Sequence, residues 1–538
     1  MRMNLGEISL SLGCTPETFS GIPRDTGFRE GGPRAASGGD SGFLSGLSSQ
    51  RIRGEQLCVP FEGYNDESEG KMPWTAVVPT GGSMDSRSVK PGDLFFCLPG
   101  ERADGHDFAS DAARAGACAI IAARDPFRNM NGAGEDTASL PPVFLVEDPL
   151  KALWRLAVCH RNTTGARVIG VTGTAGKTTV KEVLGQMLAQ RGHTERNPMN
   201  LNNQIGLPLS MLNASADALF WVMEVGISEA PDMDELGQVL RPDVALILNV
   251  GEAHLNGLGE RGVAANKALL LDYIQSGGLA LVSADYPDLL AEVEKRGNVF
   301  AEMDVDLAFF STVSRNVFSW AEYLGQRSDF SGQYRVLVGG RECCVRACFQ
   351  GDFGSENVAA IAAAAVKMGL RAGEIAQGFS DARLPEQRFN CRRYGDIILV
   401  DDSYNANPLS SMRMIRSCRS MADYFGMPLY LVMGEMLELG DRTEEAHEEL
   451  GRIMADALPA KVFWKGGQAE AVLSGLRRSG YGKDFYPVSG GQEFSLLLEE
   501  FDPQSGLFLF KGSRRNNLER LAGILRERVD TTGGADAV

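Results

Sequence analysis

Short runs of apolar, β-branched residues alternate along most of this chain with stretches in which apolar residues recur every three to four positions. A short apolar run between turn formers is typical of a strand buried on both faces, and the longer spacing is typical of a helix with one buried face. The clearest runs are residues 168–171, 219–223, 244–248, 279–282, 397–400, 429–433 and 507–510. This rhythm predicts an α/β protein with parallel sheets covered by helices.

Changes in the pattern predict three domains, at 1–146, 147–383 and 384–538. The first is predicted to be a small α/β domain. Its segment 15–71 is rich in Gly, Ser, Pro and charged residues and is predicted to be a flexible insertion. The second carries the longest strand–helix rhythm, with a small antiparallel excursion predicted at roughly 305–350, where apolar and polar residues alternate. The third is a further α/β unit.

Composition narrows the class of protein. A length of 538 residues agrees with about three domains, and a net charge of −17 argues against a general nucleic-acid binder. The ten cysteines show no metal-ligand spacing, so we expect reduced thiols. Neither a signal peptide nor an apolar stretch of membrane-spanning length is visible. We therefore expect a soluble cytoplasmic protein, with no nucleic-acid partner and no membrane insertion, that is a monomer.

The most chemically specific feature is a glycine-rich loop after the run 168–171. It consists of Gly173, Thr174, Ala175, Gly176, Lys177, Thr178 and Thr179. Apolar residues at 180, 183, 184, 187 and 188 then fall on one helical face. Between a strand and a helix, such a loop cradles nucleotide phosphates: backbone N–H groups surround the anion, the lysine adds charge and the threonine reaches Mg²⁺. Val171 stands where the strict pattern has glycine, and a plain turn is the alternative, but Lys177 and Thr178 favour phosphate binding.

Polar residues follow other predicted strands as well. Glu224 follows the run 219–223, and residues 249–254 follow the run 244–248. Because ligands of open α/β sheets bind at the carboxyl ends of the strands, these residues and the loop are predicted to share one edge.

Motifs in three remote parts of the chain together resemble the Mur ligase family of peptidoglycan synthesis. They comprise residues 85–87, 91–95 and 104–108; the loop at 170–179 with 200–206, 224–226 and 249–254; and 402–408 with 434–440 and 446–447. The resemblance covers nearly everything outside 15–71. The strings Ser-Tyr-Asn-Ala-Asn-Pro at 403–408 and Gly-Glu-Met-Leu-Glu-Leu-Gly at 434–440 are typical of one branch, which adds D-alanyl-D-alanine to UDP-N-acetylmuramoyl-tripeptide.

The resemblance implies a division of labour among the three domains. The first would bind the UDP part of the substrate, the second would be a P-loop ATPase domain, and the third, Rossmann-like, would close over the site. The implied enzyme is an ATP-dependent amide-bond ligase. The substrate carboxylate would attack the γ-phosphate to give an acyl phosphate, and the incoming amine would then expel phosphate.

The resemblance also implies roles for nucleotide and metal ligands. Lys177 would pair with the phosphates, and Thr178 with Glu224 would hold one Mg²⁺. His254 matches a histidine near a second Mg²⁺, and Lys267 matches a lysine that family members carbamylate to an anionic metal ligand. Lys177, His254 and Lys267 are the predicted catalytic residues. Arg388, Asp402, Asn405 and Asn407 match positions that reach the nucleotide from the third domain.

Substrate contacts are predicted at three places. Asp85, Ser86 and Arg87 resemble the uridine-diphosphate loop, Asn202, Asn203 and Gln204 would contact substrate, and Lys511 and Arg514 would bind the peptide or its carboxylate.

Each of these sets has a plainer alternative. His254 can be a core histidine and Lys267 a surface helix lysine. Asn202–Gln204 and Asp402–Asn407 can be turns in which Asn and Asp are common. Asp85–Arg87 can be a capped helix start.

The chain departs from the family pattern in several places. Leu269 stands where the family usually has an acidic residue, residues 283–285 replace an Asn near the adenine, and residues 351–354 replace a Gly-x-His-Asn element, although Asn357 remains. These departures motivate a rival hypothesis, a catalytically weak nucleotide-binding regulator on the same fold. Two rival enzymes are the ligase that adds the third peptide residue and an enzyme like folylpolyglutamate synthase. The string at 405–408 speaks against both enzymes.

Overall fold

The computed structural model describes residues 2–13, 76–100, 103–128, 140–251, 258 and 261–532. The contacts divide the chain into two compact units. The first consists of Met1–Gly165 with Pro208–Ala216, and the second of Ala166–Leu207 with Asp217–Val538. The predicted insertion at 15–71 lies outside the described residues. The predicted boundaries at 146/147 and 383/384 stay predictions.

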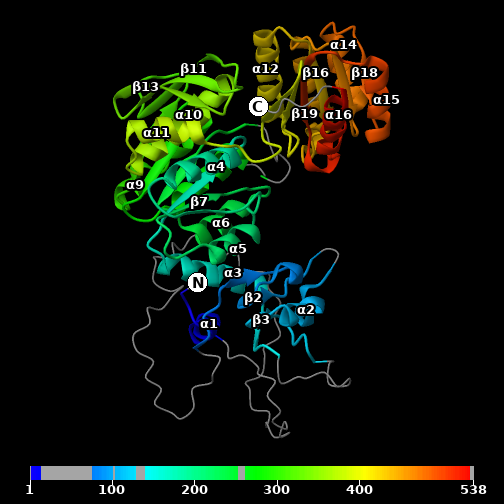
Figure 1. Cartoon of the computed structure of the whole chain (residues 1–538). Coiled ribbons are helices and arrows are strands. Elements are labelled where there is room, and N and C mark those ends of the chain that lie inside the picture. The colour runs from blue at the N-terminus through cyan, green and yellow to red at the C-terminus, as the bar shows by residue number, and fades with distance from the viewer. Residues whose placement is uncertain are drawn as a thin grey trace, which may run out of the picture. The chain divides into compact units, whose positions relative to one another are not determined.

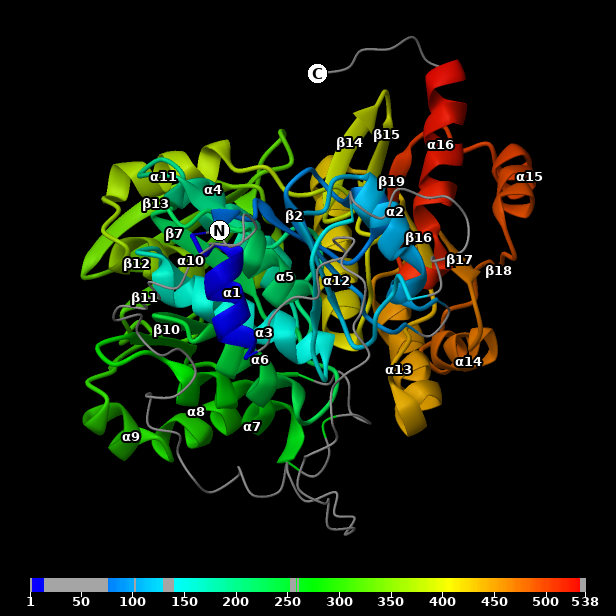
Figure 2. The same ribbon diagram turned by 90° about the horizontal axis from the view of Figure 1, so that it is seen from below.

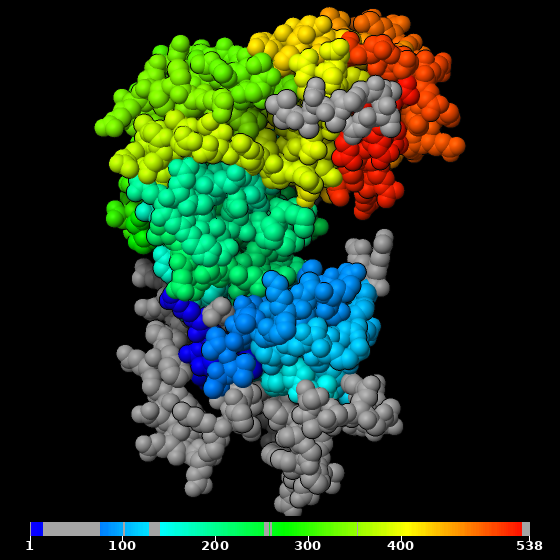
Figure 3. Space-filling model, in the orientation of Figure 1, coloured from blue at the N-terminus to red at the C-terminus, as the bar shows by residue number. Residues whose placement is uncertain are grey.

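The first unit contains a four-stranded parallel sheet in the order β1-β2-β3-β4, coloured blue to cyan in Figure 1. The strands are β1 (Gly81–Ser83), β2 (Asp93–Phe96), β3 (Ala119–Ala122) and β4 (Val143–Leu145), and the helices are α1 (Leu5–Leu12), α2 (Ala109–Arg114) and α3 (Pro149–Thr163). Phe95, Ile120 and Val143 are buried in its core. The space-filling view in Figure 3 shows the blue and cyan residues of this unit closely packed.

The second unit contains a nine-stranded sheet in the order β13-β12-β11-β10-β9-β8-β5-β7-β6. Its strands are β5 (Arg167–Thr172), β6 (Thr194–Arg196), β7 (Phe220–Glu224), β8 (Val244–Ile247), β9 (Leu279–Ser283), β10 (Asp306–Ser311), β11 (Ser319–Gln326), β12 (Gly332–Val338) and β13 (Arg341–Ala347). The strands from β6 to β11 pair in parallel, and β12 and β13 add antiparallel pairs.

The predicted antiparallel excursion at 305–350 is therefore only partly right. β10 pairs in parallel with both neighbours, and β11 to β13 extend the same sheet. Gly339 and Gly340 join β12 to β13, both with positive φ (54° and 75°), as a two-residue hairpin turn requires.

Helices cover this sheet. They are α4 (Lys177–Leu188), α6 (Asp232–Leu240), α7 (Gly262–Ala268), α8 (Pro287–Glu294), α9 (Gly297–Glu302), α10 (Gly351–Lys367) and α11 (Ala372–Asp381). Most of α5 (Gly206–Asn213) belongs to the first unit. α10 packs against α4, β11 and β12 and presents buried alanines from Ala359 to Ala365. Figure 1 shows α10 and α11 beside the light-green strands β11 and β13. Because alanine side chains are short, α10 lies close to the strands and brings its N-terminal half to the edge where β5 and β8 end.

A six-stranded sheet in the order β14-β15-β19-β16-β17-β18 completes the second unit. Its strands are β14 (Asn390–Tyr394), β15 (Ile397–Asp401), β16 (Leu429–Gly434), β17 (Lys461–Lys465), β18 (Phe485–Pro487) and β19 (Gly506–Lys511). Only β14 pairs antiparallel, with β15. The helices are α12 (Pro408–Phe425), α13 (Thr443–Asp456), α14 (Ala469–Arg478), α15 (Gly491–Phe501) and α16 (Leu518–Thr532), with α13 and α14 side by side in Figure 2.

Side-chain alternation along β15 shows how this sheet is buried on both faces. Ile398 and Val400 pack with α12, whereas Ile397 and Leu399 pack with α16. The α/β class predicted from the sequence is confirmed. Among the described residues, no helix combines the length and the apolar character that crossing a bilayer requires.

Candidate active site

The glycine-rich loop, residues 173–179, leaves β5 and enters α4, and it is called the phosphate loop below. Gly176 has a φ of +82°, and a Cβ there would lie 2.6 Å from Asn357 Oδ1. At Gly173 a Cβ would lie 3.0 Å from the Leu248 Cβ. The loop therefore needs glycine at 176, and a side chain at 173 would press on Leu248. Helix α4 begins at Lys177, so the N–H groups of its first turn have no helical acceptor and form an anion-binding end.

Lys177 folds back over this loop. Its Nζ donates to the Gly173 carbonyl at 2.9 Å. Desolvation lowers the pKa of Lys177, the Glu224 carboxylate opposes that shift, and Arg388 adds to it. A cation in this position is placed to neutralise phosphate oxygens at the N-terminus of α4.

Asn249, directly after β8, holds the first part of the loop. Its Oδ1 accepts from the N–H groups of Thr174 (2.9 Å) and Ala175 (2.8 Å). The backbone donors of these two predicted ATP-binding residues thus face the protein, and the donors of the α4 first turn, Lys177 to Thr179, are the ones at the helix end. Asn249 stood in the motif at 249–254 but received no role from the sequence. Its place directly after a buried strand was the available signal.

Thr178 and Glu224, which the resemblance assigns to one Mg²⁺, are hydrogen-bonded to each other, and their role as metal ligands stays a prediction. Thr178 Oγ1 donates to Glu224 Oε2 at 2.8 Å, and Asn202 Nδ2 donates to Glu224 Oε1 at 2.7 Å. Glu224 is 2% exposed, and within the described part of the chain no lysine or arginine is ion-paired with it. Its hydrogen-bond donors are neutral side chains, and the carboxylate oxygens lie beside the Thr178 hydroxyl, where a cation can share both oxygens.

Two buried residues outside the predicted set support Glu224. Asn197 Oδ1 accepts from the Glu224 N–H at 2.8 Å, and Asn197 Nδ2 donates to the Glu224 carbonyl at 3.0 Å. The buried Lys181 on α4 donates to the Asn197 carbonyl at 2.5 Å. Together they fix the end of β7 against α4.

The two other predicted catalytic residues differ in what is known of their positions. His254 lies outside the described residues. Lys267, on α7, is 3% exposed, so the alternative of a surface lysine is wrong. Desolvation, with a smaller contribution from Lys177, holds the pKa of Lys267 well below its usual range.

The predicted substrate residues Asn203 and Gln204 make local contacts. Asn203 Oδ1 accepts from the Gly206 N–H at 2.8 Å, which caps α5, and the Gln204 amide donates to Asp232. Of this predicted triplet, Asn202 is the residue bonded to Glu224.

Two residues from the part of the chain that forms the six-stranded sheet (the C-terminal sheet) reach the phosphate loop: Arg388, just before β14, and Asn407, at the start of α12. Arg388 Nη2 donates to Thr178 Oγ1 at 3.3 Å, and its guanidinium lies 4.2 Å from the Tyr404 ring centroid. Asn407 Nδ2 donates to the Thr174 carbonyl at 3.3 Å, while its Oδ1 caps α12 by accepting from the Ser410 N–H at 2.8 Å. Asn407 therefore combines a capping role with a contact to the loop.

Asp402 and Lys511 form a buried ion pair. Lys511 Nζ lies 2.5 Å from Asp402 Oδ2 and 3.0 Å from the Asn405 carbonyl, whereas the Asn405 side chain is exposed. Arg514 donates to Gln387 Oε1 at 2.8 Å. In this arrangement Lys511 holds the segment 402–405, and the substrate roles of Lys511 and Arg514 stay predictions.

The predicted uridine-diphosphate residues lie in the first unit. Asp85 caps a 3₁₀ turn, Ser86–Ser88, by accepting from the Arg87 N–H at 3.0 Å. The exposed Arg87 guanidinium pairs with the same carboxylate at 2.7 Å. The contacts are those of a capped helix start, and the role of Asp85, Ser86 and Arg87 in binding stays a prediction.

The departures from the family pattern have structural partners of their own. Asp285 accepts from the hydroxyl and N–H of Thr312, at 2.9 and 2.8 Å, and so holds the turn after β10. A Cβ at Gly354 would overlap the Tyr334 hydroxyl, so close packing of α10 on β12 requires glycine there. Leu269 begins the 3₁₀ turn Leu269–Tyr273 after α7.

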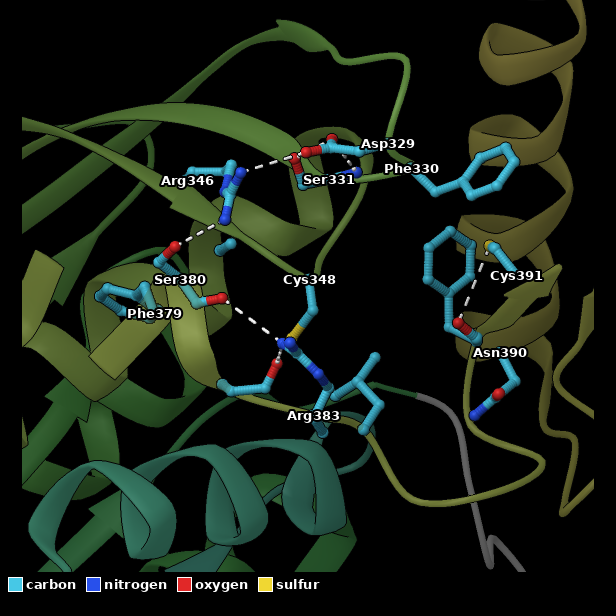
Figure 4. Close-up of a pocket in the computed structure, with 14 residues that line it drawn as sticks. Asp329, Phe330, Ser331, Arg346, Cys348, Phe379, Ser380, Arg383, Asn390 and Cys391 are labelled. Atoms are coloured by element: carbon cyan, nitrogen blue, oxygen red, sulfur yellow. Dashed lines mark hydrogen bonds and ion pairs between the residues drawn. The ribbon is translucent and has the colours of Figure 1, made fainter. Parts of the chain in front are cut away.

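A cavity of about 430 Å³ lies elsewhere in the second unit, and none of its lining residues belongs to the phosphate loop. Figure 4 shows two arginines on its wall. Arg346 pairs with Asp329 (3.2 Å) and donates to Ser380 (2.7 Å), and Arg383 donates to the Asp381 and Ala382 carbonyls (both 3.1 Å). Arg346 is thus paired with a carboxylate, whereas the acceptors of Arg383 are neutral carbonyls.

Comparisons with known proteins agree with this arrangement. The Mur ligase family, catalytic domain, matches residues 80–158; the Mur ligase middle domain matches 171–365; and the Mur ligase glutamate ligase domain matches 387–491. The chain belongs to the Mur ligase family.

Several relatives carry one particular name. A UDP-N-acetylmuramoyl-tripeptide--D-alanyl-D-alanine ligase of Bacillus subtilis is 30% identical over 452 residues, which is 83% of this chain and 93% of the relative. A crystal structure of MurF from Acinetobacter baumannii has a TM-score of 0.71 at 29% identity, covering 83% of this chain and 93% of that one. MurF from Thermotoga maritima, solved with ADP, has a TM-score of 0.71 at 27% identity, covering 84% of this chain and 98% of that one.

Proposed function

We propose that this chain is an ATP-dependent ligase that joins D-alanyl-D-alanine to UDP-N-acetylmuramoyl-tripeptide in peptidoglycan precursor synthesis. The observation that carries the proposal is the convergence on Thr178, at the N-terminus of α4, of Glu224 from one sheet and Arg388 from the segment leading into the other. The curated names of relatives that match more than four-fifths of the chain support the choice of substrates.

The reaction has two balanced steps. A substrate carboxylate oxygen bonds to the γ-phosphorus of ATP, the bond from that phosphorus to the β–γ bridging oxygen breaks, and ADP leaves with an acyl phosphate remaining. The amine of D-alanyl-D-alanine then bonds to the acyl carbon, the C–O bond to phosphate breaks, and the amine loses a proton as the amide forms. Such chemistry needs charge neutralisation and orientation rather than a protein nucleophile.

The chain's own residues fit these needs. Lys177 and Arg388 flank Thr178 at the start of α4, where positive charge and helical N–H groups face the same place. Asn407 reaches the loop from α12. We assign to Asp402, Asn405 and Asn407 the nucleotide side of the site. Asp85, Ser86, Arg87, Asn202, Asn203, Gln204, Lys511 and Arg514 are assigned to the UDP-peptide and the incoming dipeptide.

The donor set fits magnesium. Mg²⁺ prefers oxygen ligands and a carboxylate, and the Glu224 carboxylate beside the Thr178 hydroxyl supplies both, buried and without a cation of its own. When bound there with ATP, the ion would neutralise phosphate charge. We place a second Mg²⁺ with His254 and Lys267.

Lys267 fits carbamylation. Burial favours its neutral amine, which can bond through Nζ to the carbon of CO₂ and release a proton, leaving an anionic carbamate. With ¹³C-labelled bicarbonate we expect a carbamate carbon signal in the protein that is lost in Lys267→Arg. If the unmodified protein shows no carbamate signal with the labelled bicarbonate, carbamylation of Lys267 is rejected. The ligase proposal is unaffected by that result.

The test of the function is phosphate release. Purified protein is given UDP-N-acetylmuramoyl-tripeptide, ATP and Mg²⁺, with D-alanyl-D-alanine or a free diamino acid as the amine. We expect release with the dipeptide and none from Lys177→Ala. Release with the diamino acid alone would identify the ligase that adds the third peptide residue. Nucleotide binding without release from any amine would identify a regulator.

A further inference from the structure

A buried carboxylate behind the phosphate loop joins four parts of the second unit. Glu356, on α10, accepts from Asn249 Nδ2 at 2.7 Å, from the Tyr286 hydroxyl at 2.6 Å and from Arg413 Nη1 at 2.8 Å. Arg413 lies on α12 and also donates to the Tyr286 hydroxyl at 3.1 Å. The side chains of Glu356 and Arg413 are 4% and 18% exposed. Of the three donors, Asn249 follows β8, Tyr286 directly precedes α8, and Arg413 lies on α12.

Glu356 holds the far side of the Asn249 amide, whose Nδ2 donates both to Glu356 at 2.7 Å and to the Ala175 carbonyl at 3.1 Å. Asn249 Oδ1 accepts from the Thr174 and Ala175 N–H groups, so its amide nitrogen must point the other way, toward Glu356. A flipped amide would set its oxygen against a carboxylate and its NH₂ against two N–H donors. A carboxylate at 356 accepts only, so it allows one orientation. A glutamine there could still accept from Asn249, but it would carry no charge and its bond to the amide would be weaker.

Arg413 supplies the counter-charge that Glu356 needs. A buried carboxylate left without its cation is strongly disfavoured, because the charge has been taken out of water. Departure of α12 would leave Glu356 with two neutral donors only. The N-cap of the same helix, Asn407, reaches the Thr174 carbonyl. Two contacts from α12 therefore reach the start of the loop: Asn407 bonds Thr174 directly, and Arg413 acts on Thr174 and Ala175 through Glu356 and Asn249.

We propose that Glu356 is a positioning residue that links the seating of Arg413 on α10 to the geometry of the phosphate loop. The proposal rests on the proposed function only in taking the loop as the nucleotide site. Linkage is reciprocal: if a seated Arg413 strengthens nucleotide binding, bound nucleotide strengthens the seating of α12 by the same factor. The C-terminal sheet then contributes to ATP affinity from behind the loop, through residues that do not touch the nucleotide.

The test is a double-mutant cycle on the full chain. Glu356→Gln, Arg413→Met and the double variant are titrated with ADP and Mg²⁺ in a calorimeter, and the unfolding midpoint of each is measured without nucleotide. We expect each single variant to weaken ADP binding by about tenfold, and the double variant to bind no more weakly than the weaker single one. Arg413→Lys, which keeps the charge, should recover most of the affinity.

A matched control lies on the same helix. Arg416 is exposed, and Arg416→Met should leave the ADP affinity unchanged. If the fold losses of ADP affinity in Glu356→Gln and Arg413→Met multiply in the double variant, the two residues act independently and the proposal is overturned. Variants that unfold at lower temperature but bind ADP as the unmodified protein does would also overturn it, because that is what a merely structural ion pair predicts.

The two proposals fail separately. A chain that binds ADP with the expected cycle but ligates no dipeptide would reject the function and keep the role of Glu356. Ligation with an unchanged KM for ATP in Glu356→Gln and Arg413→Met would reject the role of Glu356 and keep the function.

Discussion

Glu224 and Asp402 are both buried carboxylates at the carboxyl ends of parallel strands, 2% and 8% exposed, yet their charges are balanced in different ways. Asp402 lies after β15 and has Lys511 Nζ at 2.5 Å, from the end of the neighbouring strand β19. Glu224 ends β7 and receives the Thr178 hydroxyl and the Asn202 amide, both neutral. One carboxylate carries its cation within the chain, and the other remains able to take one from outside.

The difference separates two uses of the same position in a sheet. An internal ion pair stabilises the turn at 402–405, because Lys511 also donates to the Asn405 carbonyl. A buried carboxylate with neutral donors is disfavoured in the protein alone and becomes favourable when a metal ion binds. The strand end at Asp402, with its internal ion pair, is structural. The strand end at Glu224, with neutral donors only, is a ligand site. The two can be told apart by mutation.

The largest expected effect on stability is at the internal pair. Lys511→Met leaves Asp402 buried without its cation, so we expect the free energy of unfolding to fall by about 3–5 kcal/mol. Urea unfolding followed by far-UV circular dichroism measures it. The double variant Asp402→Asn/Lys511→Met removes both charges and should recover most of the loss. If the double variant is as unstable as Lys511→Met, the ion pair is not what stabilises this edge.

Glu224→Gln should behave in the opposite way. It removes a charge that has no directly paired lysine or arginine in the described part of the chain, so we expect the free energy of unfolding to change by less than about 1 kcal/mol. Phosphate release should fall by about 10²–10³-fold, since a ligand for the charge-neutralising ion is lost. Glu229→Gln, at an exposed carboxylate that follows the same strand, is the control and should leave the rate unchanged. Normal turnover in Glu224→Gln would remove Glu224 from the metal site.

Asn407 connects the two edges, and two substitutions separate its contacts. Asn407→Ala removes the cap of α12 and the contact with Thr174, so we expect a loss of about 1 kcal/mol in stability and a raised KM for ATP. Asn407→Ser keeps a capping oxygen but is too short to reach the loop. It should restore the stability and leave the KM raised. Recovery of both by serine would show that Asn407 only caps the helix.

The smallest effect concerns a third buried group, neutral rather than charged, which lies on α13 against the segment that follows β16. His447 Nε2 accepts from the Met436 N–H at 3.0 Å, and desolvation lowers the pKa of His447. Below a pH of about 6.5 the unfolded chain binds a proton that the folded chain does not, so stability is lost as the pH falls below that value. The unfolding midpoint, measured between neutral and mildly acidic pH, should therefore fall less steeply in His447→Gln. If the unfolding midpoint falls equally steeply with pH in the unmodified protein and in His447→Gln, then groups other than His447 cause the pH dependence.

Local patterns in the sequence predicted the parts of the fold whose causes are local. The phosphate loop was recognisable because glycine, lysine and threonine have fixed spacings between a strand and a helix. Glu224 was recognisable because it directly ends a buried run. β14 was not predicted, because an edge strand with Asn390, Arg392 and Arg393 carries no continuous apolar run.

The rest of the site depends on pairings that no local pattern encodes. Glu356 and Arg413 lie on two helices and about 180 and 240 positions from the loop that they support, and each looks like an ordinary helical charge in the sequence. Lys511 was predicted as a substrate ligand, and only the register of β15 on β19 brings it to Asp402. Sequence spacing gives the chemistry of a residue, whereas its partner is decided by the tertiary fold.

The two bonds from the Thr174 and Ala175 N–H groups to Asn249 have a consequence for the entropy of nucleotide binding. A loop rich in glycine has many conformations to lose when it closes on a ligand. Here Thr174 and Ala175 are held by Asn249, which is itself bonded to Glu356, so part of that loss has already been incurred during folding. The nucleotide then meets a loop close to its binding shape, and more of the contact energy appears as affinity.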